Sequence, residues 1–208
     1  MARMTLTLLH TAEAHRATFD ALRDGIAPDV TLHHILRPDF LSRAQEAMTE
    51  DLISEIKKEI HKHPTPVLCT CTTIGPIAES AGALRIDAPM MQVAADSGGP
   101  VLMVYCLDST RAPSLALLTR ALHCTANPHP IHALPLLSLW PLFAADNHDD
   151  FARAIARETR IYIAQHPDIT AIVLAQVSMA GAARYLTDLA QPVLTSPEPA
   201  LRAALARL

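Results

Sequence analysis

The chain has 208 residues, of which 50% are hydrophobic and 18% charged, with a formal net charge of −4. This composition excludes a disordered chain, and a mildly acidic chain without a basic tract argues against nucleic acid as the main partner. Only six glycines are present, and none of them forms the spacing of a dinucleotide-binding or phosphate-binding loop. The length suits one domain or two lobes of about 100 residues each.

The first half of the sequence alternates between strand-like and helix-like segments. Helices are predicted where apolar residues recur every three to four positions, and strands where short apolar runs lie between turn residues. The predicted strands are 5–10, 30–36, 66–70 and 88–93, and the predicted helices are 12–24, 40–62 and 74–83.

The second half repeats this order of elements. Strands are predicted at 101–107, 131–136, 171–175 and 192–195, and helices at 114–123, 149–166, 179–190 and 200–208. The sequence therefore contains two repeats of about 100 residues, which meet near the turn-rich segment 96–100. We expect a lobe of residues 1–97, completed by 192–208, and a second lobe of residues 98–191.

The alternating pattern predicts an α/β fold. Each of two pseudo-symmetric, Rossmann-like lobes would hold a small parallel sheet flanked by helices. A cleft between two such lobes is the expected place for a small ligand.

The strongest candidate site follows the third predicted strand. Cys71 lies at the end of this strand, and the hydroxyl groups of Thr72 and Thr73 follow it at the start of a short helix. Backbone N–H groups at a helix start bind carboxylates, and the same helix end favours a thiolate by lowering its pKa. The segment therefore predicts a reactive thiol beside an anion-binding turn.

The corresponding segment of the second half carries no thiol. Aligning the halves places Gln176 opposite Cys71 and Ser178 opposite Thr73. Both side chains form hydrogen bonds, but neither is a base at neutral pH.

The repeated half with a Cys-Thr-Thr turn after its third strand resembles the aspartate/glutamate racemase superfamily. That group includes amino-acid and hydantoin racemases, maleate isomerase and arylmalonate decarboxylase. In its racemases each half supplies one cysteine, and the two thiols exchange the Cα proton on opposite faces. Cys71 matches the first of these cysteines, whereas Ala175-Gln-Val stands where the second is expected. The resemblance therefore implies a single-thiol reaction, such as decarboxylation or isomerisation, rather than two-thiol racemisation.

The resemblance also implies further site residues. Glutamate racemases carry Asp-Ser after the first strand, where this chain has His10 and Thr11, and His10 could act as a base or a donor. The expected catalytic residue is Cys71, and the expected substrate-binding residues are His10, Thr11, Thr72, Thr73, Ser109, Thr110, Gln176, Ser178 and Gly181. A homodimer is a further implication of the resemblance.

Three functions follow from these residues. The leading interpretation is an enzyme without a cofactor that acts on a small carboxylate through Cys71, as an isomerase or a carbon–carbon lyase. The alternative is a catalytically inactive relative that binds a small anion as a sensor or carrier. A thiol hydrolase is the third, and it requires His10 beside Cys71.

Structural interpretations remain open for several residues. Cys71 could be a small buried packing residue. Cys69 and Cys71 could form half of a metal site, but no two further ligands are suitably spaced, so no metal is expected. The other histidine pairs are typical of solvated surface positions.

The cellular location follows from the cysteines and the N-terminus. Four cysteines in this length do not form a disulfide framework, and the first ten residues are too short and polar for a signal peptide. The most apolar stretch, 131–145, is interrupted by Pro135 and Pro141 and is too short to span a bilayer. We expect a cytoplasmic protein without a membrane or nucleic-acid partner.

Overall fold

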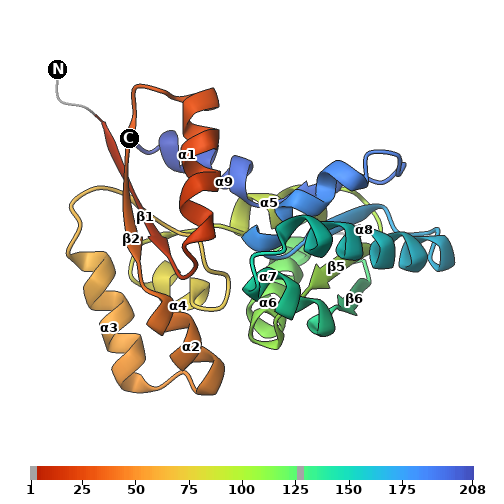
Figure 1. Cartoon of the computed structure of the whole chain (residues 1–208), viewed down its shortest axis with the longest axis horizontal. Helices are drawn as coiled ribbons and strands as arrows, with labels where there is room; N and C mark the ends of the chain where they lie inside the picture. Colours follow the sequence, from red (N-terminus) through yellow and green to blue (C-terminus); the bar gives the residue numbers. More distant parts are fainter. Residues whose placement is uncertain (1–3, 126–128) are drawn as a thin grey trace. The chain divides into compact units, whose positions relative to one another are not determined.

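The computed structural model describes residues 4–125 and 129–208. The chain divides into two compact units (Figure 1). The first comprises Met1–Ala88 and Pro197–Leu208, and the second comprises Pro89–Ser196. The sequence predicted the division after residues 97 and 191.

The first unit contains a four-stranded parallel sheet in the order β2-β1-β3-β4. Its strands are β1 (Thr5–His10), β2 (Thr31–Leu36), β3 (Val67–Cys69) and β4 (Leu84–Arg85). Its helices are α1 (Ala14–Ile26), α2 (Pro38–Glu46), α3 (Glu50–His61), α4 (Gly75–Ser80) and α9 (Pro197–Leu205). Leu9 of β1 pairs with Cys69 of β3, so both strands end at the same edge of the sheet.

The two faces of this sheet have different partners. Leu9 and Cys69 lie in an apolar cluster with Leu52 and Ile56, which form part of the buried stripe of α3. Successive side chains of a strand point to opposite faces, so His10 lies on the other face, where its ring contacts Phe19 of α1. The C-terminal helix α9 packs against α1 and β3.

The second unit contains a four-stranded parallel sheet in the order β6-β5-β7-β8. Its strands are β5 (Val101–Tyr105), β6 (Ile131–Pro135), β7 (Ala171–Leu174) and β8 (Val193–Thr195). The helical segments are α5 (Ala88–Ala95), α6 (Asp108–Cys124), η1 (Leu137–Leu139), α7 (Trp140–Ala144), α8 (His148–Gln165) and η2 (Val177–Tyr185). Strands β5 and β7 are buried along their whole length, which explains their continuous apolar sequences.

The two sheets have the same topology. In each, the strand that comes first in the chain is central and lies between the second and the third, and the fourth strand follows the third at the edge. The predicted α/β class with two parallel sheets is therefore confirmed. The repeated order of predicted elements corresponds to the same strand order in the two sheets.

Two predicted elements were wrong in the first half of the sequence. Residues 88–93 are not a strand: Ala88–Ala95 forms α5, which buries Met90, Met91, Ala94 and Ala95 at helical spacing. Residues 40–62 are not one helix, because Ala47 adopts an extended conformation. A new helix then begins after Thr49, whose hydroxyl oxygen accepts a hydrogen bond from the Leu52 N–H at 3.3 Å.

One predicted helix in the second half has a different geometry. Most of the segment expected as an α-helix at 179–190 lies in the 3₁₀ helix η2, which begins at Val177 and ends at Tyr185. Among residues 4–125 and 129–208, no helix has the length and apolar character needed to cross a membrane.

Candidate functional site

Cys71 lies two residues beyond the end of β3 and four before the start of α4. It is 6% exposed and belongs to the apolar cluster between the sheet and helices α2 and α3. The parallel pairing of β1 and β3 brings the segment after β1 to the same edge, which places Thr11 beside Cys71.

Hydrogen-bond donors surround the sulfur of Cys71. The Thr11 hydroxyl, the backbone N–H groups of Ile74 and Thr73 and the Thr73 hydroxyl all lower its pKa by stabilising the thiolate. Burial is the larger effect and raises the pKa of Cys71 above its ordinary value. This corrects the expectation of a lowered pKa: the donors favour a thiolate, but the resting group is a neutral thiol.

Cys69 is fully buried in the apolar cluster of the first unit. Its thiol donates to the Cys71 carbonyl oxygen at 3.6 Å, and burial raises its pKa far above the ordinary range. Within the described part of the chain, no group of three or more His, Cys, Asp or Glu side chains is arranged to hold a metal ion.

His10 is fully buried, and both of its ring nitrogens have partners. Nδ1 lies 2.8 Å from Thr70 Oγ1, and Nε2 lies 2.8 Å from His34 Nδ1. The Thr70 hydroxyl donates to the Leu9 carbonyl at 3.1 Å, so Thr70 Oγ1 accepts the Nδ1 proton of His10. Burial, together with the nearby His15 and His34, lowers the pKa of His10 to about 3.

A polar chain therefore extends from β3 to the surface. His10 is neutral, so its Nε2 accepts a hydrogen bond from the Nδ1–H group of His34. The Nε2 atom of His34 lies 3.3 Å from the Asp20 carboxylate. This chain occupies the α1 face of the sheet, whereas Cys71 lies in the cluster on the opposite face. Thr11 and Thr73 therefore form hydrogen bonds with the Cys71 thiol, whereas His10 forms its hydrogen bonds with Thr70 and His34 on the other face of the sheet.

The turn after Cys71 rests on a buried ion pair that the sequence analysis missed. Arg85 donates to both carboxylate oxygens of Asp87, at 2.9 and 2.7 Å, and both side chains are almost completely buried. A side chain at Gly75 would place its Cβ 3.2 Å from Arg85 Nε, so glycine allows the guanidinium to approach the turn. The available signal was two opposite charges at positions 85 and 87 within an apolar segment.

The second unit contains the counterpart of this junction. Gln176 lies two residues beyond the end of β7, as Cys71 does beyond β3, and is 7% exposed. Its Oε1 accepts hydrogen bonds from the backbone N–H groups of Cys106 and Leu107, at 2.6 and 3.2 Å. Because β1 ends at His10 and β5 ends at Tyr105, Thr11 and Cys106 occupy equivalent positions.

The remaining predicted residues of the second unit lie near this edge of the sheet. Ser109 and Thr110 are in the first turn of α6, and Thr110 is buried. Ser178 Oγ is buried and has no hydrogen-bond partner among the described residues. Gly181 lies within η2, where an added Cβ would meet Ala152 Cβ at an ordinary distance of 3.8 Å. Packing therefore does not require glycine at position 181.

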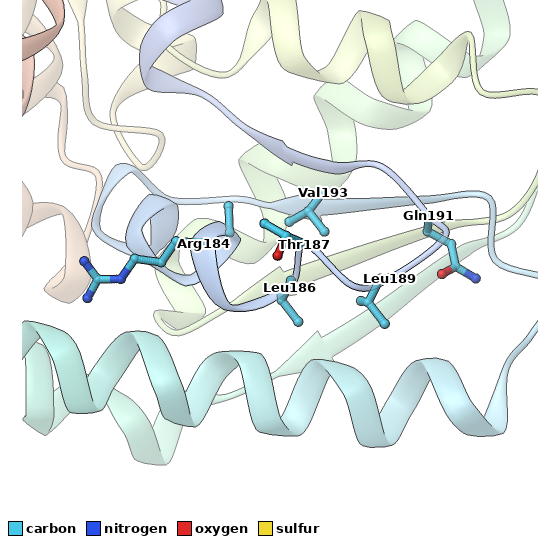
Figure 2. Close-up of a pocket in the computed structure, with 7 residues that line it drawn as sticks. Arg184, Leu186, Thr187, Leu189, Gln191 and Val193 are labelled. Atoms are coloured by element: carbon cyan, nitrogen blue, oxygen red, sulfur yellow. The ribbon is translucent and has the colours of Figure 1, made fainter.

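A pocket of about 500 Å³ in the second unit lies apart from these residues (Figure 2). Its lining comes from the end of η2, the start of β8 and the segment that joins them, including Leu186, Thr187, Leu189 and Val193. Arg184 at its rim forms a surface ion pair with Asp149. None of the predicted site residues lines this pocket, so it is not the candidate site.

Comparison with known proteins identifies the fold. No protein-family model and no curated protein sequence matches the chain. Among solved structures, the glutamate racemase of Francisella tularensis in complex with D-glutamate matches with a TM-score of 0.72 at 13% identity, over 99% of this chain and 81% of that one. The fold is that of the amino-acid racemases.

Two further structures extend the racemase fold to other chemistry. The allantoin racemase of Klebsiella pneumoniae matches with a TM-score of 0.64 at 18% identity, over 98% of this chain and 86% of that one. A variant of arylmalonate decarboxylase in its sulfate-associated form matches with a TM-score of 0.53 at 12% identity, over 97% and 92%. At these identities the racemase fold is shared, and the chemistry has to be argued from the residues themselves.

Proposed function

We propose that the protein is an enzyme without a cofactor that acts on a small carboxylate through the thiol of Cys71. The observation that carries the proposal is the set of donors around this sulfur, from Thr11, Thr73 and Ile74. A cysteine that served only for packing would gain nothing from four hydrogen bonds to its charged form. Relatives of the same fold act on small carboxylates, which supports the substrate class.

The raised pKa of Cys71 favours a role as proton donor. In a decarboxylation, the bond between Cα and the departing carboxylate breaks, the electron pair remains on Cα, and carbon dioxide leaves. The Cys71 thiol then gives its proton to Cα, and the donors from Thr11, Thr73 and Ile74 stabilise the resulting thiolate. Water returns the proton and completes the cycle.

The remaining carboxylate of the substrate requires donors of its own. We assign this role in the first unit to Thr72 and Thr73, which are buried and directly follow Cys71. In the second unit the proposal uses Gln176, Ser178 and Gly181, with Ser109 and Thr110 as further binding residues. Single variants of Thr72 and Gln176 test the two assignments separately. A raised KM would support the role of the residue changed, and an unchanged KM would refute it.

A substrate screen in deuterated water tests the enzyme proposal. Amino acids, hydantoins and α-substituted malonates are incubated with the protein, and proton NMR follows both product formation and loss of the Cα proton signal. We expect turnover or exchange with at least one α-substituted carboxylate. Absence of both with every compound would refute the enzyme proposal.

The second candidate function is binding of a small anion without catalysis. It is favoured by Gln176, which stands where a second thiol would be required for racemisation, and by the raised pKa of Cys71. Ligand binding and turnover, measured on the same compounds, distinguish the two. If carboxylates bind and no compound of the screen turns over or exchanges its Cα proton, the binding function replaces the catalytic one.

The predicted homodimer is a separate proposal. Sedimentation velocity over a range of protein concentrations tests it directly, and a monomer throughout that range would refute it.

A further inference from the structure

The polar chain of Thr70, His10, His34 and Asp20 holds one proton more than two neutral histidines supply. Nδ1 of His10 donates to Thr70 Oγ1, and Nε2 of His10 accepts from the Nδ1–H group of His34. The other ring nitrogen of His34, Nε2, lies 3.3 Å from the Asp20 carboxylate, which accepts hydrogen bonds only. In this arrangement His34 therefore carries a proton on each ring nitrogen.

The additional proton lies at the outer end of the chain. Burial and the nearby His15, His34 and Arg16 disfavour a positive charge on His10. At the other end, the Asp20 side chain is 48% exposed and its carboxylate faces His34. The proton is therefore stabilised on His34 and lies close to water, with which it can exchange.

The other charged and titratable groups around the chain come from three elements. On α1, His15 lies with its ring centroid 6.2 Å from that of His10, and Arg23 lies 3.6 Å from the same Asp20 carboxylate. On α9, which packs against α1, Glu198 and Arg202 bond to each other. On β2, successive side chains alternate between the faces, so His33 lies on the other face, beside His63.

The hydroxyl of Thr70, at the inner end of the chain, has two acceptors within reach. Its Oγ1 lies 3.1 Å from the Leu9 carbonyl oxygen and 2.8 Å from His10 Nδ1. The Leu9 carbonyl also accepts from the Thr70 backbone N–H at 3.0 Å. Because a hydroxyl rotates and donates one hydrogen bond, it can turn to His10 Nδ1 while the Leu9 carbonyl keeps a partner.

Loss of one proton leaves two possible arrangements. If all directions are kept, His34 Nε2 loses its proton and with it the hydrogen bond to Asp20. If the chain reverses, the Thr70 hydroxyl donates to His10 Nδ1, His10 Nε2 donates to His34 Nδ1, and His34 Nε2 still donates to Asp20. A hydrogen bond to a carboxylate is about twice as strong as a neutral one, so the reversed chain is the more stable.

We propose that this chain is a one-proton, pH-sensitive switch, in which loss of the second proton of His34 reverses every hydrogen bond between His34 and Thr70. The switch extends from the exposed Asp20 to Thr70, which is joined by a peptide bond to Cys71. A protonation event at the surface thereby changes the hydrogen bonding of the residue that precedes the thiol. The inference does not depend on the proposed function, since the switch operates whether or not Cys71 is catalytic.

Nitrogen-15 NMR of the full chain with labelled histidine tests the switch, because ring nitrogens with and without a proton have different chemical shifts. The His10 ring is identified by its contact with Phe19, and the pH is varied between about 5 and about 9. We expect the proton of His10 to lie on Nδ1 at low pH and on Nε2 at high pH, with the midpoint at which His34 loses its second proton. The backbone amide of Thr70 should shift with the same midpoint. A single tautomer of His10 throughout this range would overturn the switch.

The variant Asp20→Asn supplies a second test. An asparagine amide can donate to His34 Nε2, so the chain keeps all its hydrogen bonds in the original direction without the second proton. We expect His10 to carry its proton on Nδ1 at every pH and the pH-dependent shift of the Thr70 amide to be lost. The matched control is Asp24→Asn, one turn farther along α1 with a side chain 67% exposed, which should switch as the wild type does. A tautomer change that persists in Asp20→Asn, or that is lost in Asp24→Asn, would refute the role of Asp20.

Discussion

His15 makes a specific prediction about stability and pH. It lies in the first turn of α1, 8% exposed, and neither ring nitrogen has a hydrogen-bond partner among the described residues. Burial lowers the pKa of His15 from 6.5 to about 4. Folding therefore favours the neutral ring, and this contribution is complete above pH 6.5 and is lost as the pH falls towards 4.

The size of the loss follows from the two pKa values. Between pH 7 and pH 5 the unfolded chain takes up a proton at His15 and the folded chain does not, which lowers the free energy of unfolding by about 2 kcal/mol. The variant His15→Leu removes this term and also removes two unpaired polar atoms. We expect it to be more stable than the wild type by about 1–3 kcal/mol at pH 7, and by about 2 kcal/mol more at pH 5.

Urea titrations followed by circular dichroism at pH 7 and pH 5 measure these differences. The matched control is His61→Leu, at an exposed position at the end of α3, which should change stability by less than about 0.5 kcal/mol. If the wild type and His15→Leu lose the same stability between the two pH values, the buried, neutral state of His15 is wrong.

Three further predictions concern the candidate site and the packing of the units. Thr11→Val removes a donor to the Cys71 thiolate, so its pKa rises further and its alkylation at pH 8 slows by about 10-fold, measured by mass spectrometry. Asp87→Ala leaves a buried guanidinium without its carboxylate, and urea titration should show a loss of about 3 kcal/mol. Gly99→Ala places a Cβ against the Thr170 side chain, which should cost about 1–3 kcal/mol in the same assay.

Each of these variants has a control within the chain. Cys124 is an exposed thiol, and its alkylation rate should not respond to Thr11→Val. Glu79 lies 3.9 Å from Arg85 with a side chain 42% exposed, so Glu79→Gln should cost far less than Asp87→Ala. Gly25 has open space around it inside α1, where Gly25→Ala should stabilise by up to about 1 kcal/mol. Equal effects of a variant and its control would contradict the corresponding prediction.

Most of the fold could be predicted from the order of elements, because short apolar runs separated by amphipathic helices are typical of parallel sheets. The prediction was wrong at 88–93, because all of these residues except Gln92 are apolar and so short an apolar run does not distinguish a strand from a helix. The helical spacing of the buried side chains, with Val93 exposed, is evident only in the structure.

The candidate site could be predicted in part. The sequence predicts a strand end followed by Cys71, Thr72 and Thr73, because these residues are adjacent in the chain. The contact between Gln176 and the Cys106 N–H joins positions 70 residues apart, so it required the register of β5 and β7. The raised pKa of Cys71 was likewise out of reach, because it depends on burial, which the sequence does not measure.

The central claim is that the thiol of Cys71 handles a proton at the Cα of a small carboxylate. The most direct test is the rate at which solvent deuterium enters the Cα position of the best substrate, measured for the wild type, Cys71→Ala and Cys124→Ala. We predict that Cys124→Ala matches the wild type and that Cys71→Ala abolishes incorporation. Incorporation at the wild-type rate in Cys71→Ala would contradict the claim.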